Sequence, residues 1–491
     1  MFDAIMQGFY LFATWQNLML LGMGVTIGTF VGAVPGMTTP MAVALTLPFT
    51  FTLHPVSGIL LLLGVYKGGI YGGSITAILI NAPGTPAASC TVLDGYPLAR
   101  RGEARRALDI ALYASCIADF LSNLALILCA GILASLALAF GSPEVFTLIL
   151  FSLTIIASVS GDQLLKGLGA AAFGLLLATV GLDLVYGTNR FIFGEVELMS
   201  GLNFIPVLIG LFALPEIIAF FGRVEIPRKH NPLAGKGASW ADVKKTLPTI
   251  LRGSAIGVIL GAIPGIGGAP AAFLSYSEAR RTSKNADNFG KGEIEGVAAA
   301  ESGNNGTAGA TLIPLLALGI PGDVTTAIIL GAFMIHGLRP GPLLFQENLS
   351  LIYALFIGIM MSSIFLFAVG KFSIRLISRI ADIPHRILFP IVLVLCVFGA
   401  YAVNNTIFDV GVMFIMGLVG FMMLRLEIPA APFLIAFILG PMLEDNFRQS
   451  LLMSRGSWTI FFSSPICWIF WGFTVLAIFI LVRRGMRTPK V

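Results

Sequence analysis

Long apolar runs alternate with short polar segments along the whole chain. Runs of about 20 apolar residues recur from one end of the sequence to the other, and a helix of that length spans roughly 30 Å of hydrocarbon. The 491 residues leave room for about 10–12 such helices with their loops. The pattern therefore predicts an all-α polytopic membrane protein.

One of these runs is rich in residues that interrupt a helix. Residues 71–102 read YGGSITAILINAPGTPAASCTVLDGYPLARRG, and no charge lies between Lys67 and Asp94. The run is long enough to cross a bilayer, yet Gly, Pro, Ser and Thr dominate its middle. Irregular backbone at membrane depth is tolerated only where it is buried in protein or lines a wet cavity. We therefore expect a broken, protein-enclosed segment here.

The chain contains a duplication. Residues 24–36 read GVTIGTFVGAVPG and residues 253–265 read GSAIGVILGAIPG, and seven of the thirteen positions are identical. Glycine recurs at every fourth position of both stretches, which leaves one helix face bare so that another backbone can approach closely. Each ladder ends in Pro-Gly, and because proline breaks a helix we predict breaks at Pro35-Gly36 and at Pro264-Gly265.

Two further pairs of segments support the duplication. INAPGTPAAS is matched later by LGIPGDVTTA, which predicts a second pair of breaks at Pro83 and Pro321. PVLIGLFALPEIIAFF, which starts at Pro206, is matched by PFLIAFILGPMLEDNF, which starts at Pro432. The sequence thus predicts two transmembrane repeats, 1–225 and 251–491, joined by a basic cytoplasmic linker over 226–250.

The basic loops indicate how the two repeats are oriented. After its second motif the early half carries Arg100, Arg101, Arg105 and Arg106. After its first motif the later half carries Arg280, Arg281, Lys284 and Lys291. Since basic loops face the cytoplasm, non-equivalent loops of the two halves are cytoplasmic, and we expect inverted repeats. The apolar stretch between the linker and Arg280 then enters the membrane and returns as a re-entrant hairpin.

Composition excludes several classes of protein. The chain is 57% hydrophobic and 11% charged, whereas soluble proteins carry about 25% charged residues. The net charge of +5 lies in loops and does not indicate nucleic-acid binding. The N-terminus lacks a basic region, so we expect no cleavable signal peptide. Five Cys without paired spacing and four His predict no firm metal site. Without a nucleophile motif, a His-rich site or a GxxxxGK[ST] loop, the chain is predicted not to be an enzyme.

Broken segments at matching places in inverted halves are typical of a transporter's binding site. Half-helix N-termini suit carboxylates, whereas hydroxyl, amide and free carbonyl oxygens suit Na⁺. The candidate substrate- and ion-binding residues are Thr38, Thr39, Asn81, Gly84, Thr85, Ser89, Asn304, Asn305, Thr307, Gly322, Asp323, Thr325 and Thr326. The candidate hinge residues are Pro35, Gly36, Pro83, Pro264, Gly265 and Pro321. A coupling Na⁺ would lie near Asn81 and Asn305, whereas coupling to H⁺ would use Glu301 or Asp323.

Several of these features also have a purely structural interpretation. Glycine ladders serve most often as helix-packing faces. Glu301 and Asp323 either belong to the site or cap helix ends, as Asp often does. Asp94, which precedes GYPLARR, is interpreted as a helix boundary at the cytoplasmic face. The cluster from Arg100 to Arg106 is interpreted as a topology signal.

At these motifs the sequence resembles the large permease subunit of the tripartite tricarboxylate transporters. The matching segments include GAVPGMTTPMAVALTLPFTF, the stretch from Tyr71 onward, AAAESGNNGTAGATLIPLLALGIPG and LGPMLEDNFRQSLLMSRG. The resemblance implies a multi-pass permease of the bacterial inner membrane that imports a small carboxylate, with a cation gradient as the driving force. It also implies two partners, a small four-helix membrane subunit and a periplasmic solute-binding protein.

One alternative function stays open. The same fold would serve a stand-alone secondary carrier for another small anionic solute. The sequence does not say which carboxylate is carried, or whether Na⁺ or H⁺ drives the uptake.

Overall fold

A computed structural model describes residues 2–158, 164–183, 187–221, 235–380 and 385–485. The described chain is almost entirely helical, and its one sheet is a hairpin of two short strands. Five described helices are long and apolar enough to cross a membrane, or six if a pair bent by 70° counts as one span. The described chain also contains apolar helices of 10–17 residues. The protein is an all-α polytopic membrane protein, while the count of 10–12 crossings stays a prediction.

The chain divides into two compact units. Unit 1 comprises Met1–Leu133 and Phe220–Leu395, and unit 2 comprises Ala134–Ala219 and Cys396–Val491. Each unit therefore combines a stretch from the early part of the chain with a stretch from the later part. The duplication inferred from the sequence thus runs through both units.

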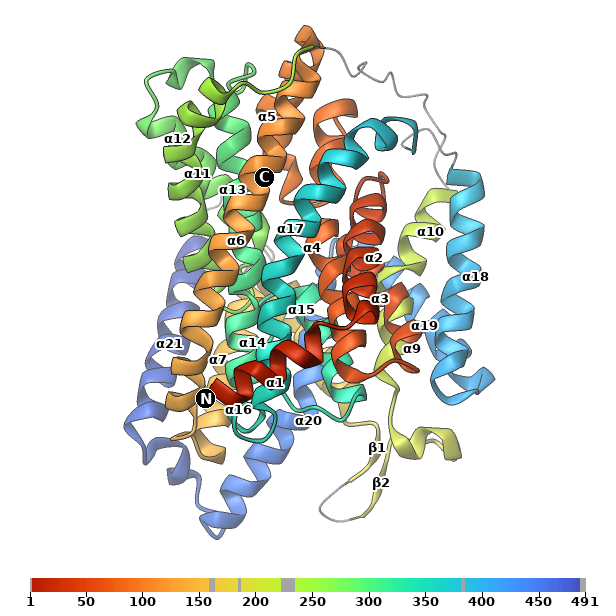
Figure 1. The fold of residues 1–491 in the computed structure, drawn as a ribbon. Helices are drawn as coiled ribbons and strands as arrows, with labels where there is room; N and C mark the ends of the chain where they lie inside the picture. The colour runs from red at the N-terminus through yellow and green to blue at the C-terminus, as the bar shows by residue number, and fades with distance from the viewer. Residues whose placement is uncertain (1, 159–163, 184–186, 222–234, 381–384, 486–491) are drawn as a thin grey trace. The chain divides into compact units, whose positions relative to one another are not determined.

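The early part of unit 1 contains six α-helices. They are α1 (Phe2–Phe12), α2 (Trp15–Gly32), α3 (Thr39–Thr46), α4 (Pro55–Ile80), α5 (Ala88–Leu98) and α6 (Ala104–Ala137), with the short helices η1 (Leu47–Thr50) and η2 (Ala99–Glu103) between them. Helix α6 continues across the boundary into unit 2. Figure 1 shows α2 and α4 packed side by side, and α1 bent away from α2.

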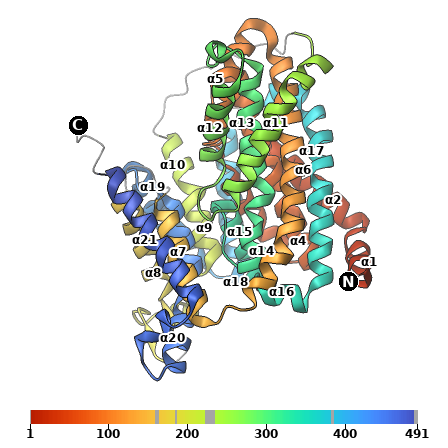
Figure 2. The ribbon, with the colours of Figure 1, turned by 90° about the vertical axis from the view of Figure 1, so that its left-hand side faces the viewer.

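The later part of unit 1 follows a similar order. It contains α11 (Trp240–Gly261), α12 (Gly268–Thr282), η4 (Ala286–Asn288), α13 (Ile294–Ala310), α14 (Leu312–Leu318), α15 (Val324–Ile335), α16 (Pro342–Glu347) and α17 (Leu349–Ile380). Helices α11, α12 and α13 lie side by side in both views (Figures 1 and 2). Part of the predicted linker, from Trp240 onward, is the first half of α11, and residues 226–234 lie outside the described residues.

The glycine ladders are packing faces in both halves. A Cβ atom at Gly28 of α2 would lie 2.1 Å from the backbone oxygen of Val65 in α4. In the later half, a Cβ atom at Gly257 of α11 would lie 2.6 Å from the backbone oxygen of Gly303 in α13. Since only glycine permits such close approach of two helices, the prediction that each ladder clears a helix face is confirmed.

The four predicted breaks are all present. Helix α2 ends before Pro35-Gly36 and α11 ends before Pro264-Gly265, and both of these glycines have φ of +87°. The segment around Pro83 separates α4 from α5, and the segment around Pro321 separates α14 from α15. The conformation with positive φ is one that glycine adopts without strain, so Pro-Gly both stops the helix and turns the chain.

The basic segments of unit 1 gather at one end. Arg106 pairs with Asp242, Lys245 pairs with Glu293 at 2.6 Å, and Gly292 lies against Arg101. The hydrogen bonds from Arg106 lower the pKa of Asp242 to about 2, so this pair stays ionised at neutral pH. Three segments that the sequence marks as basic thus share one end of the unit, as cytoplasmic loops should.

Unit 2 combines two of the long apolar helices, Ile407–Arg425 and Ala430–Met453, with shorter ones and one hairpin. Its elements are α7 (Ser142–Ser158), α8 (Leu164–Ala178), β1 (Gly181–Leu182), β2 (Asn189–Arg190), η3 (Val196–Ser200), α9 (Phe204–Phe212), α10 (Leu214–Phe221), the end of α18 (His385–Asn404), α19 (Ile407–Arg425), α20 (Ala430–Met453), η5 (Trp458–Phe462) and α21 (Pro465–Gly485). Gly181 pairs with Arg190 in the antiparallel hairpin.

Packing within unit 2 is reciprocal. Helix α8 of the early half packs on α20 of the later half, and α9 of the early half packs on α19. Close glycine contacts mark both pairs: Gly174 meets the backbone of Phe433, and Gly210 meets the backbone of Met413. In both pairs a helix of one half packs on a helix of the other half. This is the pattern expected for repeats related by a twofold axis.

Candidate functional site

All predicted site residues lie in unit 1. Those of the early half and residues 322–326 lie at or next to helix breaks, whereas Asn304, Asn305 and Thr307 lie inside α13. In the early half, Thr38 is the N-cap of α3 and accepts a hydrogen bond from the Met41 N–H, while Asn81 is the left-handed C-cap of α4, with φ of 57°. Asn81 is exposed, whereas the hydroxyl of Thr39 is buried and makes no hydrogen bond with the described residues. Thr85 and Ser89 are half-buried at the start of α5.

The break after α4 lets the chain double back. Gly84 donates a backbone hydrogen bond to Gly73 at 3.3 Å, and a Cβ atom at Gly84 would lie 2.2 Å from the backbone oxygen of Gly32. Helix α5 therefore starts beside the middle of α4 and runs along its last turns, where Gly95 meets Ile78. The small residues of this segment let the chain fold back against α4, because each close contact between the two backbones requires a small residue.

The breaks of the later half are joined to each other. The backbone N–H of Gly265 donates to the carbonyl of Gly322 at 2.7 Å, which ties the Pro264-Gly265 turn to the segment before α15. Asn304 faces Gly268 at the start of α12, and the amide nitrogen of its side chain is buried with no hydrogen-bond partner among the described residues. Thr307 donates to its own helix, at the Asn304 carbonyl.

Helices that follow a break cross over to the opposite half. Helix α5 of the early half packs on α12 and α13, whereas α15 of the later half packs on α3 and α4. No hydrogen bond among the described residues joins Asn81, Thr85 or Ser89 to the predicted site residues of the later half. The breaks thus lie in one unit. Side chains other than Asn81, Thr85 and Ser89 make the hydrogen bonds between the halves.

Asp94 corrects one of the sequence-based interpretations. We expected a helix boundary, but Asp94 lies within α5 and is fully buried. Its carboxylate accepts backbone hydrogen bonds from Gly290, Gly292 and Glu293 at 2.7–2.9 Å, and one from the Tyr276 hydroxyl at 2.7 Å. A side chain of the early half therefore caps the start of α13 in the later half. The two positions are far apart in the sequence, so the sequence alone does not reveal this contact.

Glu301 does not cap a helix end. It lies in the middle of α13 and is fully buried. Its carboxylate accepts hydrogen bonds from Thr91 of α5, from Ser115 of α6 at 2.9 Å and from Asn305 of its own helix at 3.4 Å. Neutral donors from both halves therefore surround one buried carboxylate.

Asp323 caps a helix and also contacts the early half. It is the N-cap of α15 and forms a capping box with Thr326, whose N–H donates to the carboxylate at 2.7 Å. The same carboxylate accepts a hydrogen bond from Tyr66 of α4 at 3.0 Å, and Tyr66 also meets Thr311. Thr325 is buried in the first turn of α15 and Gly322 packs on Thr311. The cap thus links the later break to the early half.

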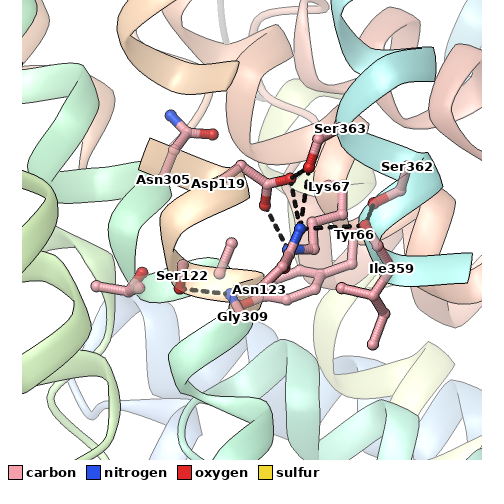
Figure 3. Close-up of polar contacts among 12 residues, drawn as sticks. Tyr66, Lys67, Asp119, Ser122, Asn123, Asn305, Gly309, Ile359, Ser362 and Ser363 are labelled. Atoms are coloured by element: carbon pink, nitrogen blue, oxygen red, sulfur yellow. Dashed lines mark hydrogen bonds and ion pairs between the residues drawn. The ribbon is translucent and has the colours of Figure 1, made fainter. Parts of the chain in front are cut away.

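A buried ion pair is the main feature that the sequence analysis missed. Lys67 of α4 pairs with Asp119 of α6, and both side chains are 1% exposed. Asn123 and Ser363 complete the cluster: Lys67 donates to Asn123 at 2.6 Å, and Ser363 donates to Asp119 at 2.6 Å. Figure 3 shows these side chains pointing toward one another. Single charges inside apolar runs, which are usually functional, were the available signal.

Lys67 and Asn305 occupy equivalent places in the two halves. Gly28 contacts Val65, and the equivalent Gly257 contacts Gly303, so Val65 of α4 corresponds to Gly303 of α13. Lys67 and Asn305 each lie two residues after these positions and therefore correspond as well. Both side chains reach α6: Lys67 pairs with Asp119 (Figure 3), and Asn305 donates to Ser115, one turn earlier, at 2.9 Å. Helix α6 therefore carries a row of polar side chains that contact both halves of the duplication.

Comparison with known proteins agrees with this architecture. Residues 18–435 match the family described as "Tripartite tricarboxylate transporter TctA family". An uncharacterized 52.8 kDa protein in the TAR-I ttuC' 3' region of Agrobacterium vitis is 39% identical over 464 residues, which cover 94% of this chain and 92% of that protein. An uncharacterized protein in the TAR-II ttuC' 3' region of the same organism is 36% identical over 48% of this chain and 97% of its own length. No solved structure matches.

Proposed function

Because the chain belongs to the tripartite tricarboxylate transporter TctA family, we propose that it is the large permease subunit of a binding-protein-dependent secondary transporter. It is a multi-pass membrane protein of a transporter family. The proposal adds a small di- or tricarboxylate as the substrate, a cation gradient of Na⁺ or H⁺ as the driving force, and the bacterial inner membrane as its location.

The crossed packing of the two broken segments carries this proposal. Helices α5 and α12 both start at a break, and neither of their N-caps, Ala87 and Gly267, provides a side-chain hydrogen bond. At α5 the N–H groups of Ala88 and Ser89 already donate to Thr85 and Pro86. The start of α12 has no side-chain cap, so its first N–H groups keep a partial positive charge that attracts a carboxylate. Asn81 is exposed at the same break as α5, which supports a role for it in holding the substrate.

Two partners complete the proposed system. A periplasmic solute-binding protein delivers the carboxylate, and a small four-helix membrane subunit accompanies the permease. Uptake then depends on the binding protein, and the cation gradient replaces nucleotide hydrolysis.

Uptake into proteoliposomes tests the proposal. Vesicles that contain this chain and the small subunit receive radiolabelled citrate or other C4–C6 carboxylates, with or without purified binding protein, under an imposed Na⁺ or proton gradient. The expected result is uptake that requires both the binding protein and one gradient. Uptake that persists without the binding protein supports a stand-alone carrier instead, and accumulation of none of the carboxylates contradicts the substrate class.

Variants then test the site. Asn81→Ala and Asn305→Ala are expected to lower uptake at least about tenfold, since a hydrogen bond to a charged group is worth about 1.5–3 kcal/mol. Asn288→Ala, in an exposed stretch between α12 and α13, is the matched control and should leave uptake unchanged. Equal uptake by all three variants would contradict a role for the broken segments.

A further inference from the structure

Glu301 is a buried charge without a cationic partner. The carboxylate is fully enclosed, and no Lys, Arg or His of the described residues forms an ion pair with it. Lys67, the buried cation of α4, is already paired with Asp119. An isolated buried carboxylate is strongly disfavoured unless a cation or a proton accompanies it. The structure therefore leaves one negative charge to be balanced at this place.

The groups around Glu301 are oxygen-bearing and come from four helices. Thr91 of α5 and Ser115 of α6 contact the two carboxylate oxygens, one each. Ser74 of α4 is a further hydroxyl neighbour of the same carboxylate. Its hydroxyl is fully buried, yet it forms no hydrogen bond of normal geometry with any described residue. A buried hydroxyl that makes no hydrogen bond of normal geometry, beside a buried carboxylate without a cation, is the observation that points to a missing ligand.

The chemistry of this cluster selects the ligand. Carboxylate and hydroxyl oxygens are hard donors that suit hard cations. A single carboxylate balances a single positive charge, whereas a divalent ion would leave one charge uncompensated in the interior. Hydroxyl groups donate to Glu301 when no ion is bound, and they can rotate to offer lone pairs when one is. The cluster thus matches a small monovalent metal ion.

We propose that Glu301, Thr91, Ser115 and Ser74 bind a sodium ion between α4, α5, α6 and α13. The ion holds α5, which follows the early break, against α13 of the later half. Asn305 donates both to Ser115 and to Glu301 and positions this pair. The identification of the ion as the coupling ion rests on the proposed function, but its binding does not.

Thermal unfolding of the purified full chain in detergent tests the proposal without substrate or partner proteins. Sodium chloride replaces choline chloride at constant ionic strength and constant pH. Because a ligand that binds only the folded state raises stability with its concentration, Tm is expected to rise saturably with Na⁺. Glu301→Gln should abolish this rise, since the neutral amide offers no charge to balance.

Ser74→Ala is the decisive variant because it separates binding from folding. Ser74 makes no hydrogen bond of normal geometry with the described residues, so Tm in choline chloride should fall little. The Na⁺ concentration that gives half of the Tm rise should increase about tenfold, as expected for one lost ligand. Ser254→Ala removes another buried hydroxyl, one that bonds only its own helix at Ile250, and should leave this concentration unchanged.

Three outcomes overturn the proposal. They are a Tm that does not respond to Na⁺, a response that Glu301→Gln and Ser74→Ala both retain, and a Tm that follows pH but not Na⁺, which assigns a proton to Glu301. Failure of the transport function is distinguishable. A saturable, Glu301-dependent Tm rise together with no carboxylate uptake leaves the sodium site in place and contradicts only the proposed substrate.

Discussion

The buried charges of unit 1 are held in three different ways. Lys67 and Asp119 neutralise each other, Asp94 is held by backbone N–H groups, and Glu301 has only neutral donors. Breaking a buried pair is far more damaging than replacing both partners, because one removal leaves the other charge uncompensated. Each carboxylate therefore responds differently when it is neutralised.

Lys67→Met and Asp119→Asn should each lower the free energy of unfolding by about 3–5 kcal/mol, because each leaves a single buried charge. The double variant should lose clearly less than the sum, since no charge then stays buried alone. Thermal unfolding of the detergent-purified variants measures this. Arg281→Met removes an exposed pair with Glu278 and should show no measurable change. Additive losses in the double variant would contradict direct coupling.

The ion pair also shows why sequence reasoning stopped short. Lys67 was seen only as the edge of a charge-free run, and Asp119 lies in an apolar stretch of α6, 52 positions away. A lone charge indicates function, but its partner depends on which helices pack together. Asp94 was misinterpreted for the same reason, because its backbone partners at 290–293 lie about 200 positions further along the chain.

At the scale of helices, local patterns were the informative ones. Pro-Gly and every-fourth glycine act within one or two helical turns, so Pro35, Pro264 and both glycine ladders were predicted correctly. The return of the chain at Gly84 and the crossing of α5 onto α13 are long-range events. No local pattern encodes these long-range contacts. The sequence therefore predicted where the helices break more accurately than it predicted which side chains join the two halves.

Gly28→Ala should destabilise the α2–α4 pair, because the new Cβ atom would lie 2.1 Å from the Val65 carbonyl oxygen. Forced separation of packed helices costs about 1–3 kcal/mol. Gly131→Ala is the matched control, since a Cβ atom there meets nothing within 4 Å and alanine is favoured over glycine in helices by about 1 kcal/mol. Thermal unfolding should therefore move in opposite directions, and equal shifts would contradict the packing role.

Asp94→Ala should loosen the segment between α12 and α13. Three backbone N–H groups lose their acceptor, and the loss of even one such bond, about 1.4 kcal/mol, increases local opening tenfold. Trypsin cleavage after Arg280, Arg281, Lys284 or Lys291 should accelerate at least about tenfold. Tyr276→Phe removes only one of the four bonds to Asp94 and should have a smaller effect. Unchanged cleavage in Asp94→Ala would show that other contacts hold the segment.

At the scale of the whole chain, the duplication and the distribution of charge give the same orientation. Segments near Arg101, Asp242 and Gly292 meet at one end of unit 1. Helix α4 ends toward this side, since Ile78 near its C-terminus packs on Gly95 of α5, which continues to the arginines. The start of α4, and the loop before it, therefore belong to the opposite end.

This arrangement predicts opposite sides of the membrane for two exposed positions, Thr52 before α4 and Lys284 after α12. Cys129, which is exposed, is first replaced by serine, and Thr52→Cys or Lys284→Cys is then introduced. A membrane-impermeant maleimide added to intact cells should label Thr52→Cys, and it should label Lys284→Cys only after permeabilisation, because basic segments stay in the cytoplasm. These positions follow equivalent glycine ladders, so opposite labelling is what inverted repeats require. Labelling of both from the same side would mean parallel repeats, and would remove the twofold relation on which the matched pair of broken segments depends.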